Sequence, residues 1–127
     1  MRGPEQGQAT VEAVLIAPVL VALALSVVQV GVVVRDRVLL AHVGREAARA
    51  AAVEPTLEAA TTAARGATGL SDERLSVTFA SPSGSPLGTS GDRLTVIVRY
   101  RAPTTVPIVG IFIPDIDLET LTTTRIE

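Results

Sequence analysis

Hydrophobic and polar residues divide the chain into two parts with different patterns. The 22 residues from Ala13 to Val34 carry no charge, and their apolar run is interrupted by Pro18, Ser26, Gln29 and Gly31. As a helix rising 1.5 Å per residue, this run spans about 33 Å, which matches a hydrocarbon core of about 30 Å. The sequence therefore predicts one membrane-spanning helix.

Helical spacing continues beyond this run. Apolar residues recur one, three and four positions apart as far as Ala50, with charged residues between them. We expect one helix from about Gln8 to Val53, with Pro18 as a kink because it removes a backbone hydrogen bond.

A second, short helix is predicted directly after the first. Glu54 and Pro55 fit a helix restart, because proline is tolerated in the first turn of a helix. The helical pattern that follows ends near Gly66 or Gly69, as helices often end at glycine.

Three strands are predicted in the rest of the chain. Residues 74–80, RLSVTFA, and 93–101, RLTVIVRYR, alternate apolar and polar side chains, and 118–127, LETLTTTRIE, is threonine-rich. The linker at 81–91 is rich in small residues and proline, so the first two strands form a hairpin with a long connection. The apolar side chains predicted to share one face are Leu75, Val77, Phe79, Leu94, Val96, Val98 and Tyr100. This face is expected to pack on the helix over residues 35–53.

The segment VPIVGIFIP at 106–114 is apolar but too short to cross a bilayer. It either covers the sheet or forms an exposed apolar patch for a partner or for the membrane surface. The candidate interface residues in it are Ile108, Val109, Ile111, Phe112 and Ile113.

Together these elements predict an α+β fold. A long N-terminal membrane-spanning helix extends into a soluble helix, followed by a short second helix and a small three-stranded antiparallel sheet. We divide the chain into a leader at 1–7, a transmembrane or assembly helix at 8–34, and a soluble domain at 35–127.

Charge and composition bear on several classes of function. A net charge of −2 without long basic runs disfavours a nucleic-acid partner. The chain has no cysteine and no lysine, so thiolate catalysis and a lysine-bearing phosphate loop are both excluded. His42 and Glu46 have i, i+4 spacing, but no third metal ligand is evident. We expect no metal, no cofactor, no small-molecule substrate and no enzymatic activity.

The N-terminal run also allows a secretory signal peptide, because the segment Ala22–Ala24 resembles a small-residue cleavage site. Two features oppose this alternative. The residues before the run include Glu5 and Glu12 beside Arg2, and the apolar run continues ten residues beyond Ala24.

Glu12 is a carboxylate at the edge of the apolar run. A charged residue is costly at the centre of a membrane helix and less so near its end, so Glu12 gains from a cationic partner. If the chain were cut after Gly7, the new α-amino group of Gln8 would lie four residues before Glu12 on the same helical face. The amino group could then pair with Glu12 of its own chain or of a neighbour.

Gly7, four intervening residues and then Glu12 resemble the prepilin-peptidase site of type IV pilin-like proteins. In that family, cleavage follows the glycine, and the glutamate is fifth in the mature chain. Joined to the apolar helix with its early Pro18 and the later AR segment, this pattern resembles the TadE-like pseudopilins of tight-adherence pili. The resemblance covers Gly7–Val53, and the ending TTTRIE is similar to a family ending with an arginine near the last strand.

The resemblance implies a minor pseudopilin that acts in pilus biogenesis and adhesion. It implies processing by a prepilin peptidase, pilin and other pseudopilin partners, and indirect dependence on an assembly ATPase and platform proteins. It also implies a single pass through the bacterial cytoplasmic membrane, with the C-terminal domain outside the cytoplasm or on the cell surface. The alternatives are a single-pass anchored binding module without such processing, and a membrane-tethered enzyme that would need a constellation the sequence lacks.

Overall fold

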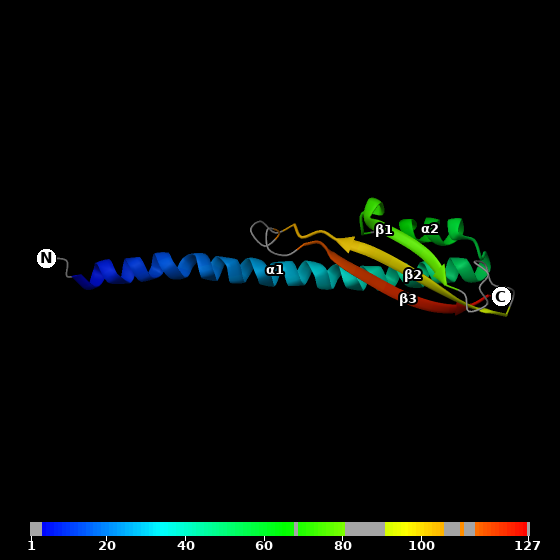
Figure 1. Cartoon of the computed structure of the whole chain (residues 1–127), viewed down its shortest axis with the longest axis horizontal. Coiled ribbons are helices and arrows are strands. Elements are labelled where there is room, and N and C mark those ends of the chain that lie inside the picture. The colour runs from blue at the N-terminus through cyan, green and yellow to red at the C-terminus, as the bar shows by residue number, and fades with distance from the viewer. Residues whose placement is uncertain (1–3, 68, 81–90, 106–109, 111–113, 127) are drawn as a thin grey trace.

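The computed structural model describes residues 4–67, 69–80, 91–105, 110 and 114–126. Its longest element is helix α1, Pro4–Val53, whose N-terminal half projects away from the other elements (Figure 1). The helix begins four residues before the expected Gln8, in keeping with the preference of proline for the first turn. It continues through Pro18 and ends where the sequence predicts, at Val53.

The short second helix is α2, Leu57–Gly66, and the described chain also contains a 3₁₀ turn, η1, at Asp72–Arg74. The side chain of Thr56 caps α2, because its hydroxyl oxygen accepts the backbone N–H of Ala59 at 3.1 Å. The expected position of Pro55 in the first turn is therefore wrong, since Pro55 precedes the cap. The sequence analysis did not predict η1.

The three strands form an antiparallel sheet in the order β1-β2-β3. Strand β1 spans Leu75–Ala80, β2 spans Arg93–Ala102, and β3 spans Ile116–Arg125. The predicted α+β class and the three antiparallel strands are confirmed, although β3 begins two residues before the predicted segment. Val98 of β2 lies opposite both Val77 of β1 and Thr120 of β3, which fixes the register of the sheet.

One face of the sheet packs against α1 and forms the core (Figure 1). The expectation that this face covers the helix beyond residue 35 is confirmed, because Leu40, Val43 and Ala47 are buried beneath it. Helix α2 packs against α1 and β1, and its buried residues are two alanines, Ala60 and Ala64. The remaining buried apolar residues are Ala48, Ala51, Leu70, Leu94, Val96, Val98, Tyr100, Ala102, Leu118 and Ile126.

Strand β3 lies close to α1 at Gly44. A Cβ atom at this position would lie 2.7 Å from Thr120 Cγ2 and 3.2 Å from Thr122 Oγ1, both on the inward face of β3. The 2.7 Å distance is shorter than real Cβ contacts, so a side chain here would force Thr120 to shift, and the position strongly favours glycine. Gly44 thereby lets the strand cross directly over the helix.

Candidate functional site on the N-terminal helix

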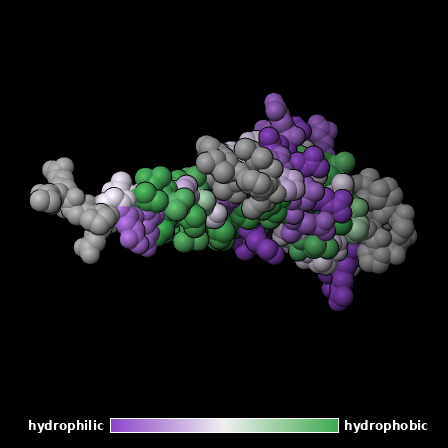
Figure 2. Space-filling model, turned by 60° about the vertical axis from the view of Figure 1, so that its left-hand side comes forward, coloured by the Kyte–Doolittle hydropathy of each residue, from purple (hydrophilic) through white to green (hydrophobic). Residues whose placement is uncertain are grey.

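The segment of α1 at 13–28 has an apolar surface on nearly all sides. Figure 2 shows hydrophobic residues along the N-terminal part of the molecule and hydrophilic ones gathered over the domain beyond it. In the described chain, α1 is the one helix long and apolar enough to cross a membrane. A helix that is apolar all round is stable only in lipid or among other helices. The large apolar side chains here, each 45–67% exposed, are Val14, Leu15, Ile16, Val19, Leu20, Val21, Leu23, Val27 and Val28.

The first buried side chain along the described part of α1 is Gln29, within the charge-free run. Gln29 is 4% exposed, Val33 packs against the core, and Asp36 is 5% exposed. With Leu40 and Val43, these residues form one stripe with alternating spacings of four and three, so all of them face the same side of the helix. The segment that is exposed on all sides is therefore shorter than the sequence run, because one side of its last turns is buried.

Gly7, Gln8 and Glu12 lie on the exposed N-terminal turns of α1. They line a shallow hollow together with Val11 and Leu15. Gln8 and Glu12 are one helical turn apart, and none of the ion pairs found in the described part of the chain involves Glu12. The arrangement presents a carboxylate next to the position that would carry the new α-amino group if the chain were cut after Gly7.

The peptide bond between Gly7 and Gln8 lies inside a helix. A Cβ atom at Gly7 would have no neighbouring heavy atom within 4 Å, so no packing contact of the folded chain requires glycine here. Glycine does weaken the helix locally, by about 1 kcal/mol relative to alanine. That cost favours transient unwinding of this turn, which an enzyme that binds an extended peptide would need.

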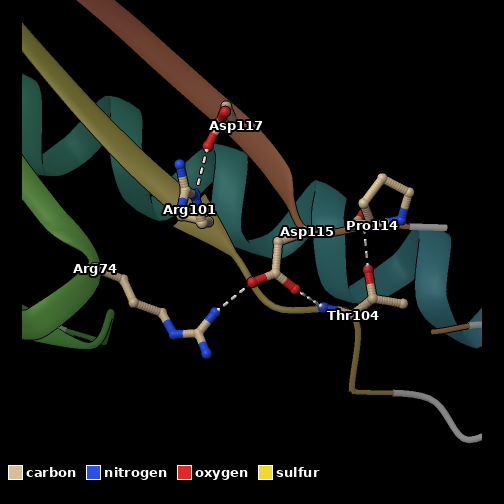
Figure 3. Close-up of polar contacts among 6 residues, drawn as sticks. All are labelled: Arg74, Arg101, Thr104, Pro114, Asp115 and Asp117. Atoms are coloured by element: carbon tan, nitrogen blue, oxygen red, sulfur yellow. Dashed lines mark hydrogen bonds and ion pairs between the residues drawn. The ribbon is translucent and has the colours of Figure 1, made fainter. Parts of the chain in front are cut away.

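A polar cluster closes the end of the sheet nearest the N-terminal half of α1 (Figure 3). Asp115 accepts hydrogen bonds from Arg74 Nη1 at 2.9 Å and from the Thr104 backbone N–H at 3.2 Å. The Thr104 hydroxyl donates to the Pro114 carbonyl oxygen, also at 3.2 Å. The Thr104 backbone hydrogen bond, with the nearby Arg74 guanidinium, lowers the pKa of the Asp115 carboxyl. These contacts tie together the two ends of the connection between β2 and β3.

Sequence analysis missed this cluster, since its members are separated by up to 41 positions. The candidate interface residues Ile108, Val109, Ile111, Phe112 and Ile113 belong to the same connection but lie outside the described residues. Among the residues described, no group of three or more His, Cys, Asp or Glu side chains is placed to hold a metal ion. The features brought together are thus an exposed apolar helix, its terminal carboxylate and a small domain on its far half.

Comparison with known proteins identifies the same stretch of helix. A family model described as TadE-like protein matches residues 7–49, which include Gly7, Glu12, Pro18 and the first turns beneath the sheet. No curated protein and no solved structure matches the chain. The resemblance found in the sequence is confirmed over this segment, so the N-terminal helix of the chain is similar to that of TadE-like proteins.

Proposed function

We propose that this protein is a minor pseudopilin that acts by assembling with pilin-like subunits of a tight-adherence pilus. The observation that carries the proposal is the uncovered apolar segment of α1, which ends in an exposed carboxylate at Glu12. The segment can be held by lipid before assembly and by other apolar helices after it, since both surroundings satisfy the same surface.

Processing after Gly7 is the first step of the proposed function. A prepilin peptidase removes residues 1–7, and the cut leaves a charged α-amino group on Gln8. Support comes from the Gly7-to-Glu12 spacing and from the exposed, glycine-weakened turn in which the bond lies.

Glu12 then contributes to assembly by pairing with the α-amino group of Gln8 on a neighbouring subunit. A carboxylate among apolar surfaces is costly when unpaired, so a neighbour that supplies a cation at one fixed height is preferred over other positions. Because the pairing forms only at the correct axial offset, it sets the register between helices.

The proposed orientation places the domain beyond Arg35 outside the cytoplasm, as the family resemblance implies. Arg35 and Arg37 follow the apolar run and favour the opposite orientation by the positive-inside rule. Asp36 lies between them, 3.8 Å from Arg35, so the local excess of positive charge is small.

Intact-mass analysis of the protein from its native membranes tests the processing step. The mature chain is expected to begin at Gln8. Retention of residues 1–7 in cells that contain an active prepilin peptidase would refute the pseudopilin function. It would favour instead an anchored binding module that needs no cleavage.

A further inference from the structure

The outward face of the sheet carries two cross-strand pairs of opposite charge. Arg99 of β2 lies opposite Glu119 of β3, with Nε and Oε2 2.7 Å apart, and Arg101 lies opposite Asp117, with Nε and Oδ1 3.1 Å apart. Each of these arginines therefore faces an acid of the same chain, an arrangement that stabilises neighbouring strands.

A third cross-strand pair on this face joins two residues of like charge instead of opposite charge. Arg93 at the start of β2 lies opposite Arg125 at the end of β3, and both side chains are exposed. Arg125 Nε donates to the Gly91 carbonyl oxygen at 3.0 Å, whereas the side chain of Arg93 has no hydrogen bond or ion pair within the described part of the chain. The two arginines line a hollow with Thr123. Like charges directly opposite each other destabilise a sheet, so an anion bound beside this pair would stabilise it.

The position of this arginine pair follows from the strand directions. Strand β2 starts and β3 ends at the end of the sheet farthest from the N-terminal half of α1 (Figure 1). When α1 is inserted in a membrane, Arg93 and Arg125 therefore lie at the end of the domain far from the bilayer. We call these two residues the distal arginine pair.

Two exposed carboxylates lie toward the opposite end. Asp72 and Glu73 form the start of η1, directly before β1, and none of the ion pairs of the described residues includes them. Leu75, the residue that follows η1, pairs with Tyr100 near the end of β2, which sets Asp72 and Glu73 on the membrane side of the domain. We call them the proximal acidic pair.

We propose that the distal arginine pair of one subunit binds the proximal acidic pair of a second copy stacked above it. The inference rests on the assembly function proposed above and deepens it by naming a contact and a partner. Arginine suits this role because its planar fork donates two parallel hydrogen bonds to a carboxylate. The two pairs have opposite charge and lie toward opposite ends of the sheet, so each subunit offers one of each.

The orientation of α1 selects this arrangement over sheet-edge pairing. An antiparallel pairing of β3 with β3 of a second copy would point the two α1 helices in opposite directions, which a shared membrane or a polar fibre forbids. Stacking along the axis keeps both helices in the same direction. It is a heterologous contact, which repeats without closing and so forms a line of subunits.

The length of the domain also determines at which stage of assembly the stacked contact forms. Ten residues of β2 extend about 33 Å, so the upper copy is raised by roughly that distance, comparable with the membrane core. A copy raised this far no longer has its whole apolar segment in the bilayer. The stacked contact therefore belongs to subunits that have entered the fibre and is absent between subunits that remain in the membrane.

Cysteine cross-linking of the full chain in piliated native cells tests the contact, because the chain contains no cysteine of its own. One copy carries Thr123→Cys beside the distal arginine pair, and a co-expressed copy carries Ser71→Cys beside the proximal acidic pair. A short bismaleimide is expected to join the two copies. Arg93→Glu with Arg125→Glu in the first copy should lower the yield at least tenfold.

Exchanging the charges between the two copies then shows whether the lost cross-link reflects a specific contact or a folding defect. Adding Asp72→Arg with Glu73→Arg to the second copy should restore the cross-link to the first copy's reversed arginines. The matched control, Arg45→Glu on the exposed side of α1, should leave the yield unchanged. A cross-link that persists after reversal of the distal pair, or that the exchange does not restore, overturns the proposal.

These outcomes distinguish a failure of the stacked contact from a failure of the proposed assembly function. Suppose that the mature protein begins at Gln8 and co-purifies with pilin subunits, yet the two cysteines do not cross-link when the arginine and acidic pairs are wild type. The stacked contact is then wrong, and the assembly function stands. If residues 1–7 are retained, the assembly function itself fails.

Discussion

Gly44 of α1 lies directly beneath Thr120 of β3, where an added Cβ would approach the threonine Cγ2 to 2.7 Å. Replacing Gly44 by valine should destabilise the domain by about 2–3 kcal/mol, because β-branched side chains on both elements cannot rotate away from each other. Thermal unfolding of the full chain in detergent micelles measures the loss.

Two variants control this measurement. Thr120→Ala added to Gly44→Val should recover part of the stability, since it removes the atoms that clash. Gly31→Val, where a Cβ meets no atom within 4 Å, should leave the unfolding of the domain unchanged. Equal losses at positions 31 and 44 would mean that helix propensity, rather than the crossing of β3, explains the effect.

Asp115 should make the stability of the domain depend on pH. Its pKa is lowered in the folded chain, mainly by the Thr104 backbone hydrogen bond, from an ordinary value of 3.8. A lowered pKa means that the stabilisation is fully present above that ordinary value and is lost as the pH falls through the folded pKa. The difference in melting temperature between wild type and Asp115→Asn should therefore shrink below about pH 4.

A partial variant tests the cause of this dependence. Arg74→Gln keeps the Thr104 hydrogen bond but removes the guanidinium, so it should reduce the pH-dependent difference without abolishing it. A difference that stays constant from pH 7 to pH 3 would show that Asp115 acts through packing alone.

Substitution at Gly7 should affect processing without affecting the fold. The structure leaves open space around this position, so Gly7→Leu is accommodated in the helix. The leucine side chain should nevertheless block cleavage by crowding the scissile bond in the peptidase site. Mass spectrometry should find the full-length chain for Gly7→Leu and the mature chain for the control Gly31→Leu. Normal cleavage of both variants would show that Gly7 is not part of the processing site.

The domain beyond Arg35 should lie outside the cytoplasm. A reporter that is active only after export, fused beyond Glu127, is expected to be active, and a reporter that works only in the cytoplasm is expected to be silent. The reverse result would mean that Arg35 and Arg37 determine the orientation, as the positive-inside rule alone suggests.

Periodicity in the sequence predicts much of this fold. A spacing of two identifies the inward residues of β1 and β2, such as Val77 and Val98, because strand side chains alternate between faces. Helical spacing likewise predicts that α1 continues to Val53, as the structure shows. In both cases the information is local, and a residue's neighbours along the chain decide its environment.

Contacts between distant segments could not be predicted in the same way. The pairing of Arg99 with Glu119 and that of Arg93 with Arg125 depend on the register of β2 and β3, which no short motif specifies. Gln29 lies within a lipid-like run, yet its side chain is buried. Because such burial arises from tertiary packing, the sequence pattern assigned this residue to the membrane segment.

The exposed N-terminal turn of α1 leads to a defined expectation for Glu12. Glu12→Gln removes a charge from the helix, so insertion and cleavage after Gly7 should proceed normally. Pairing with the α-amino group of Gln8 on a neighbour would be lost, at a cost of about 1–3 kcal/mol, or roughly tenfold or more in subunit association. Glu46→Gln, on the same helix outside the apolar segment, is the matched control and should assemble normally.

The most direct test is the yield of Glu12→Gln protein that co-purifies with its pilin partners from native cells, normalised to the amount cleaved after Gly7. The expected result is full cleavage with co-assembly reduced at least about tenfold. Full cleavage with wild-type co-assembly would contradict the account, because Glu12 would then be an interfacial residue without a role in joining subunits.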